Sequence, residues 1–355
     1  MKKQMIIMFM LALVSSFIFA DEISRTYYFK NPQISAKGDF QTLKFENSLL
    51  TGITGEPVLP YQSVVLLLPP GHVAASFEIS GKNKITLPGE YKLYPKQHVQ
   101  PVSKGASGEF VINSELYQNN ENYPAKNYGR MDTEFMNGYS IAMFTFTPVQ
   151  YNPADSELSY FAEVQVKINT RPEVRAENAL ANLAANENIQ EKVMHFVHNP
   201  ENLKLYEAKS RDEGDYEMLI ITPEQFVEDF SQLTESYHGK GIRSEFVTIE
   251  YLQTDGTGQD MQEKIRNYII QEYQEHNIIY ALLGGDVAHV PARGFYCTVE
   301  SSSTYEDDNI PSDLYYSALD GTWNDDGDNL WAEIGEDDLL PEVSVARMSF
   351  SDASE

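Results

Sequence analysis

The chain has 355 residues, a length that accommodates about two domains. Its 53 acidic and 26 basic residues give a net charge of −27, which argues against binding to nucleic acid or to anionic lipid, because both need clustered Lys and Arg. The single cysteine excludes an intrachain disulfide and a cysteine-rich zinc site.

Residues 1–20 have the pattern of a secretory signal peptide. Lys2 and Lys3 precede an apolar run shorter than the roughly 20 residues that span a bilayer, and Ala20 supplies the small residue of a cleavage site. We therefore expect a protein that is secreted to the extracellular space or the cell surface, without a membrane span after cleavage. An uncleaved anchor helix is the alternative.

Strand signals dominate from about residue 26 to residue 168. The apolar run 63–68 ends at a Pro-Pro-Gly turn, and the runs 139–147 and 159–168 alternate between apolar and polar residues. Short strands separated by Gly, Pro and Asn turns predict a β-sandwich-like domain over residues 21–205.

The segment 170–214 differs in composition from the strands before it. It is rich in Ala, Asn and Glu, which favours a surface helix or a flexible linker, and Lys204, Lys209 and Arg211 offer basic cleavage points. We expect this segment to be exposed and to separate two domains.

Residues 215–355 show a third pattern, in which apolar strands alternate with amphipathic helices. The runs 216–221, 244–249 and 278–283 predict strands, 260–273 predicts a helix, and 343–346 could add a fourth strand. This order indicates a parallel sheet with right-handed crossovers. The whole chain is therefore predicted to be α+β and multidomain, with a β-sandwich-like domain before an α/β subdomain.

The last 55 residues are strongly acidic, with 15 Asp or Glu against one Arg. Tyr and Trp lie among these carboxylates, which suggests a folded loop that needs a counter-charge. Calcium takes carboxylate and carbonyl oxygens as ligands, and the spacing resembles a loose calcium loop. The expected ligands are Asp320, Asn324, Asp326, Asp328 and Glu333. A solvated acidic loop without an ion is an equal alternative.

Catalytic candidates within the chain are weak. Cys297 is the one thiol, and a thiol nucleophile needs a base, for which His289 is the nearest histidine in sequence. A structural or free thiol is the simpler interpretation of Cys297. No glycine pattern for a dinucleotide occurs, so no organic cofactor is expected.

Four segments carry a family resemblance. TGEPVLP at 54–60 and FTPVQYNP at 146–153 resemble the propeptide domain of gingipain-type cysteine peptidases. YEMLIITP at 216–223 and YALLGGDVAHVPAR at 280–293 resemble the first half of the catalytic domain in the same family. The segments occur in the family's order.

The resemblance implies a secreted cysteine endopeptidase that is made as a zymogen. It would attack protein or peptide substrates with a thiolate, and its own propeptide would be an intramolecular partner. The family's His–Cys dyad lies in the second half of a caspase-like domain, and no position here matches it. Residues 215–355 are thus expected to be an incomplete first subdomain of a truncated chain, with the dyad downstream. The alternative is a non-catalytic secreted protein whose modules bind calcium or a partner.

Overall fold

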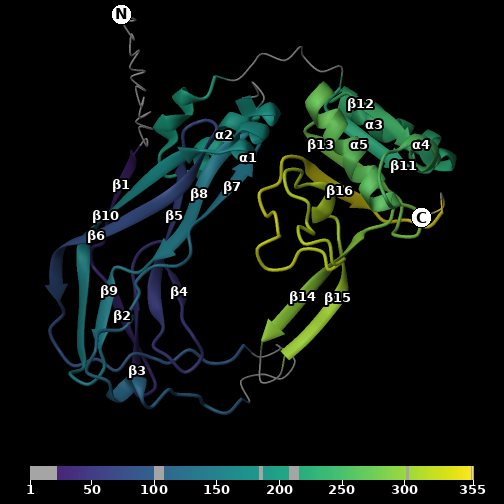
Figure 1. Cartoon of the computed structure of the whole chain (residues 1–355). Coiled ribbons are helices and arrows are strands. Elements are labelled where there is room, and N and C mark those ends of the chain that lie inside the picture. Colours follow the sequence, from purple (N-terminus) through teal and green to yellow (C-terminus); the bar gives the residue numbers. More distant parts are fainter. Residues whose placement is uncertain are drawn as a thin grey trace, which may run out of the picture.

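The computed structural model describes residues 22–99, 108–183, 187–207, 216–300, 304–352 and 354. The predicted signal peptide and the basic residues Lys209 and Arg211 lie outside these ranges. Among the described residues, no helix is both long enough and apolar enough to cross a bilayer. We call residues 22–207 the first module and residues 216–354 the second module (Figure 1).

The first module consists of antiparallel sheets with helices at one end (Figure 1). One sheet has the order β1 (Glu22–Tyr28), β10 (Glu157–Pro172), β6 (His72–Thr86), with β9 (Val149–Asn152) also paired to β10. A second has the order β4 (Leu49–Thr51), β5 (Leu59–Leu67), β8 (Tyr139–Phe146), β7 (Asp132–Met136). A separate hairpin joins β2 (Gln33–Lys37) to β3 (Phe40–Lys44), and a short 3-10 turn, η2, spans Leu116–Gln118.

The alternation of apolar residues along the strands explains why these sheets pack. In β10, Val164, Val166 and Ile168 are buried while the residues between them are more exposed. They share one core with Phe144 and Phe146 of the second sheet. The strands predicted at 63–68, 139–147 and 159–168 are therefore confirmed.

The segment after β10 is helical and packs on the first module. It contains α1 (Val174–Ala179), η3 (Leu180–Asn182), α2 (Glu187–Phe196) and η4 (Pro200–Leu205). Val193 and Val197 lie four residues apart on one face and pack on Val65 and Tyr139 of the second sheet. The surface helix allowed for in this segment is present, and most of its side chains outside the apolar stripe are exposed. The overall polarity of the segment conceals the stripe by which the helix packs on the second sheet.

The second module is built on a parallel sheet. Its order is β12 (Ser244–Thr248), β11 (Met218–Thr222), β13 (Tyr280–Gly284), β16 (Ser344–Met348), and every neighbouring pair is parallel. The connections contain η5 (Glu224–Phe230), α3 (Ser231–His238), α4 (Ile249–Asp255), α5 (Met261–His276) and η6 (Leu314–Tyr316). A hairpin of β14 (Arg293–Glu300) and β15 (Thr304–Ser312) extends from it (Figure 1).

Both faces of this sheet are covered, which explains the continuous apolar run of β11. Leu219 and Ile221 pack in one core with Ile265 and Ile269 of α5. The alternate residues Met218 and Ile220 belong to the core on the other side, with Phe226 and Phe230. A strand buried on both faces has no polar alternation. The predicted fold class, α+β with a sheet and helices in both parts, is confirmed at this level.

Candidate functional site

His289 and Cys297 do not form a site. Nε2 of His289 lies 3.0 Å from the carbonyl oxygen of Ser351, and its ring packs on the edge of Phe226. Cys297 is exposed in the β14–β15 hairpin, opposite Asp307. Among the described residues, no contact joins this thiol to this imidazole. The pair therefore lacks the nucleophile–base geometry of a cysteine peptidase.

The structure brings together three of the five predicted calcium ligands. One carboxylate oxygen each from Asp326, Asp328 and Glu333 lies within 4.8 Å of the others. Partial burial and then the charges of Asp328 and Asp326 raise the pKa of Glu333. Oδ1 of Asn324 is buried without a hydrogen-bond partner in the described structure, but this residue is outside the group.

The predicted role of Asp320 as a ligand of that loop is not supported by its position. Its Oδ1 accepts a hydrogen bond from Nδ2 of Asn182 in the first module, at 2.8 Å. Sequence proximity to the acidic loop was misleading, because the chain turns at Gly321 and packs Asp320 beside Asp338. Asp320 therefore belongs to the contact between modules.

This contact centres on the turn between β7 and β8. Asn137 and Gly138 form the turn with φ angles of 51° and 85°. The backbone N–H of Asn137 donates to Oε1 of Glu342 at 3.1 Å, and its Nδ2 donates to the Tyr273 hydroxyl at 2.8 Å and to the Glu342 carbonyl at 3.1 Å. A Cβ at Gly138 would lie 2.6 Å from the backbone nitrogen of Leu183, so only glycine fits there.

Two further residues of the first module complete the contact. Asn182 accepts from Nε2 of Gln274 at 3.2 Å, besides donating to Asp320. Nζ of Lys192 donates to the carbonyl of Pro341, and Leu340 packs in the core of α2. We call this contact the seam; it comprises Asn137, Asn182 and Lys192 of the first module and Tyr273, Gln274, Asp320, Pro341 and Glu342 of the second.

The seam contains buried carboxyl groups whose charge is poorly compensated. Burial and the charges of Asp320 and Asp338 raise the pKa of Glu342 well above its usual range. Burial and then the charge of Asp338 raise the pKa of Asp320 to about 6. The charge of the buried Arg266 acts on Asp320, but its N–H groups donate to the carbonyls of Tyr315, Ala318 and Gly321. The carboxyl groups therefore favour their neutral form.

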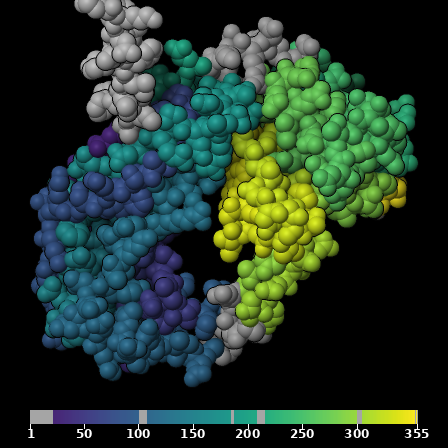
Figure 2. Space-filling view, viewed as in Figure 1, coloured from purple at the N-terminus to yellow at the C-terminus, as the bar shows by residue number. Residues whose placement is uncertain are grey.

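A cleft lies beside the seam. The surface is hollowed between the modules (Figure 2), where a cavity of about 1200 Å³ is lined by Glu134 and Arg175 on one side and by Asp320 and Asp338 on the other. Burial and the charge of Asp338 raise the pKa of Glu134. The two modules thus meet through the hydrogen-bonded seam and, beside it, an acidic cleft.

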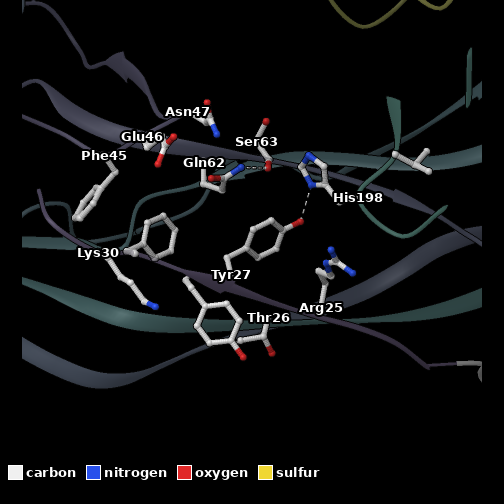
Figure 3. Close-up of a pocket in the computed structure, with 13 residues that line it drawn as sticks. Arg25, Thr26, Tyr27, Lys30, Phe45, Glu46, Asn47, Gln62, Ser63 and His198 are labelled. Carbon is white, nitrogen blue, oxygen red and sulfur yellow. Dashed lines mark hydrogen bonds between the residues drawn. The ribbon is translucent and has the colours of Figure 1, made fainter. Parts of the chain in front are cut away.

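A second cavity, of about 850 Å³, lies within the first module between β1 and the segment after α2 (Figure 3). Nδ1 of His198 lies 2.9 Å from the Tyr27 hydroxyl and 3.4 Å from the Val65 nitrogen. The Val65 N–H can only donate, so Nδ1 accepts and the Tyr27 hydroxyl donates. Burial lowers the pKa of His198 and raises that of Tyr27. This pair ties the helical segment to β1 and brings no nucleophile to the cavity.

Most seam residues could not be identified from sequence. Asn137-Gly138 is recognisable as a turn between two strands, but its partner Glu342 is 205 positions away. Of the seam residues, the sequence points to Asp320 alone as a site residue, and it does so for calcium binding. Lys192 lies among exposed polar residues of α2, where no local pattern indicates its contact with the Pro341 carbonyl.

Comparison with known proteins gives two family matches that follow each other along the chain. The model Propeptide_C25 matches residues 26–197, and Peptidase family C25 matches residues 211–355. Gingipain R2 of Porphyromonas gingivalis is 21% identical over 262 residues, which are 73% of this chain and 34% of that protein. Gingipain R1 of the same species is 20% identical over 264 residues, 72% of this chain and 25% of that protein.

Solved structures also show similarity. One is described as a complex of Porphyromonas gingivalis RgpB pro- and mature domains; it is 14% identical with a TM-score of 0.41 and covers 51% of this chain and 93% of its own. Another concerns the zymogenic latency of gingipain K, with 18% identity, a TM-score of 0.37 and coverage of 44% and 89%. The chain spans about a third or less of the curated relatives' length.

Proposed function

Because the chain belongs to the gingipain-type cysteine peptidases and carries their propeptide, we propose that it is part of a secreted endopeptidase zymogen. The first module is the propeptide, and the second module is part of the peptidase domain. The observation that carries this proposal is that the two matched regions are docked on each other through the seam. A propeptide that keeps its enzyme latent has to stay bound to it, and the seam supplies such a contact.

The reaction is peptide-bond hydrolysis in proteins or peptides. A cysteine thiolate attacks the scissile carbonyl, the acyl-enzyme forms with loss of the amine, and water releases the acid. We propose that residues outside this chain, downstream of it, provide the thiol and its base, since Cys297 is exposed on a hairpin and is not in contact with His289. The finer architecture follows the same proposal: a β-sandwich-like propeptide and a caspase-like parallel sheet.

The test is thiol-dependent hydrolysis by the product of the whole reading frame. We expect this protein to cleave a peptide mixture, to lose activity with iodoacetamide, and to keep it in the Cys297→Ala variant. Residues 22–355 alone should hydrolyse no peptide. Thiol-dependent activity of residues 22–355 that disappears in Cys297→Ala would overturn the assignment and restore His289 and Cys297 as candidates.

Secretion and maturation belong to the same proposal. The composition of residues 1–20 supports removal of a signal peptide, and the basic residues between Lys204 and Arg211 support a maturation cleavage before β11. Mass spectrometry of trypsin-nicked protein should find the first cut in this stretch, leaving pieces of about residues 22–205 and 212 onward. First cuts between residues 60 and 160 would contradict the propeptide boundary.

Calcium binding is the second candidate function, and the approach of Asp326, Asp328 and Glu333 favours it. An ion there would offset their mutual repulsion and stabilise the folded state by mass action. We expect the melting temperature to rise in millimolar calcium and to fall with chelator, and Asp326→Asn with Glu333→Gln to abolish the response. Glu306→Gln, on the exposed hairpin, is the control. An unchanged melting temperature in calcium would leave a solvated acidic loop without an ion as the interpretation.

A further inference from the structure

We propose that the seam is a proton-operated latch: Glu342 and Asp320 share one proton while the two modules are docked, and loss of that proton weakens docking. The inference rests on the proposed function, because it takes the first module as the propeptide of the second. It adds a regulator, the proton, and a specific contact on which the proton acts.

The Glu342 carboxyl group is enclosed by both modules. Oε1 accepts from the Asn137 N–H at 3.1 Å, and Oε2 accepts from the Leu319 N–H at 2.7 Å. Only 5% of the residue is exposed. Asn137 also holds the Glu342 backbone carbonyl, so the first module covers this residue through two groups. Separation of the modules would open this side of Glu342 to water.

Asp320 completes the pair. Its Oδ1 accepts from Asn182 at 2.8 Å, whereas in the described structure no N–H or hydroxyl donor reaches its buried Oδ2. The Asp320 and Glu342 carboxyl groups lie within hydrogen-bonding reach of each other. Two carboxylates can only accept, so a hydrogen bond between them requires a proton on one. The shared proton supplies the donor that the Asp320 oxygen lacks.

The surrounding charges do not replace that proton. Asp338 lies beside the pair and Glu134 of β7 faces Asp338, so acidic groups are present on both sides. The cations are Arg266, which is engaged by three carbonyls, Lys192, which donates to the Pro341 carbonyl, and Arg175, which lies near Glu134. Burial lowers the pKa of Lys192, although the Glu342 charge opposes this. Ionisation of both Asp320 and Glu342 therefore leaves excess negative charge in a buried place.

The direction of the pH effect follows from these pKa shifts. In the docked state the pKa of Asp320 is raised from 3.8 to about 6, and that of Glu342 is raised further above its usual range. Burial is the largest cause of both raised pKa values, and separation would return water to both groups, so both pKa values should fall toward their usual range, although Asp338 stays beside the pair and the Asn137 and Asn182 donors, which lower these pKa values, are lost. Docking is thus strongest below about pH 4 and weakens as pH rises through 6 and above. The Asp320 shift alone corresponds to at most about a hundredfold in the docking equilibrium.

A two-dye experiment on residues 22–355 tests the latch. In a Cys297→Ser background, dyes are attached at Lys82→Cys on β6 and Glu235→Cys on α3, both exposed positions in different modules. Energy transfer is followed through a urea titration at pH 5 and pH 8, with circular dichroism recorded in parallel. We expect the urea midpoint for dye separation to be lower at pH 8, corresponding to a docking constant at least tenfold weaker than at pH 5.

Amide variants decide whether the seam carboxyl groups cause the pH dependence of docking. Glu342→Gln and, independently, Asp320→Asn supply a donor that does not titrate, so each should reduce the pH-dependent change by at least half. Glu245→Gln, on the exposed part of β12, should keep the full change. If one variant does not fold, as judged by circular dichroism, the other decides. An equal pH response in all folded variants, or tighter docking at pH 8, would overturn the latch. Neither result bears on peptide hydrolysis, which tests the proposed function separately.

Discussion

Arg293 contacts both a carboxylate and two aromatic rings within the second module. Its guanidinium donates to both carboxylate oxygens of Asp260, at 2.7 and 2.8 Å, and lies 3.9 Å from the Trp331 ring centre. Tyr315 flanks it at 4.6 Å. Asp260 also begins α5 by accepting from the Glu263 N–H at 2.8 Å. The planar, forked guanidinium is required, because an ammonium cannot make the same paired contact while stacking.

Replacement of Arg293 by lysine should therefore destabilise the second module although the charge is kept. We expect Arg293→Lys to lower the free energy of unfolding by about 1–3 kcal/mol. Arg243→Lys is the matched control, because Arg243 forms an exposed ion pair with Glu217 and should tolerate lysine. Thermal denaturation by circular dichroism measures the stability of both variants. Equal melting temperatures for the two variants would show that the paired hydrogen bonds and the stacking of Arg293 do not stabilise the module.

Asn137 serves the seam through its backbone and its side chain. Asn137→Gly keeps the left-handed conformation but removes the amide that holds Tyr273 and Glu342. We expect it to lower the free energy of unfolding by about 1–3 kcal/mol. Asn137→Ala should cost about 1–2 kcal/mol more, because alanine resists positive φ.

The control for this pair is Asn47→Gly, an exposed residue with a φ of 60°. It should be nearly neutral in urea denaturation, since it gives up no buried contact. If Asn137→Gly is as stable as Asn47→Gly, the side-chain contacts across the seam contribute nothing.

At the scale of elements, periodicity predicted most strands correctly. The alternation in 159–168 reflects a strand with one buried face, and the continuous apolar run 216–221 reflects a strand buried on both faces. Both strands could therefore be predicted from the sequence pattern. The apolar stripe of the segment 187–206 was harder to recognise. Its buried residues are few, most of its exposed residues are charged or polar, such as Glu187, Gln190 and Glu191, and composition averages the two.

The packing of α2 can be tested with neighbouring residues. Val193 is fully buried, whereas Met194 is 42% exposed. Val193→Ala should lower the free energy of unfolding by about 1–3 kcal/mol through lost burial and a cavity. Met194→Ala removes more atoms but should change it by less than about 0.5 kcal/mol. Similar losses in urea denaturation for the two variants would contradict the packed position of this helix.

At the scale of the whole molecule, the seam unites parts that the sequence shows as separate. Its hydrogen bonds join residues 91 to 205 positions apart, and no local pattern reports such pairs. The family resemblance correctly identified propeptide and peptidase parts. It could not show that Asn137 and Asn182 meet Glu342 and Asp320, nor that Asp320 leaves the acidic loop. Those placements depend on how the two modules dock.

Release of the first module tests whether it is a propeptide that docks on a cysteine peptidase. The product of the whole reading frame is assayed for peptide hydrolysis at pH 8 before and after cleavage between residues 207 and 216 and removal of the first module. Hydrolysis should rise at least tenfold on removal and should be retained by the Cys297→Ala variant. Equal hydrolysis before and after removal, or its loss in Cys297→Ala, would contradict a propeptide that docks on a cysteine peptidase.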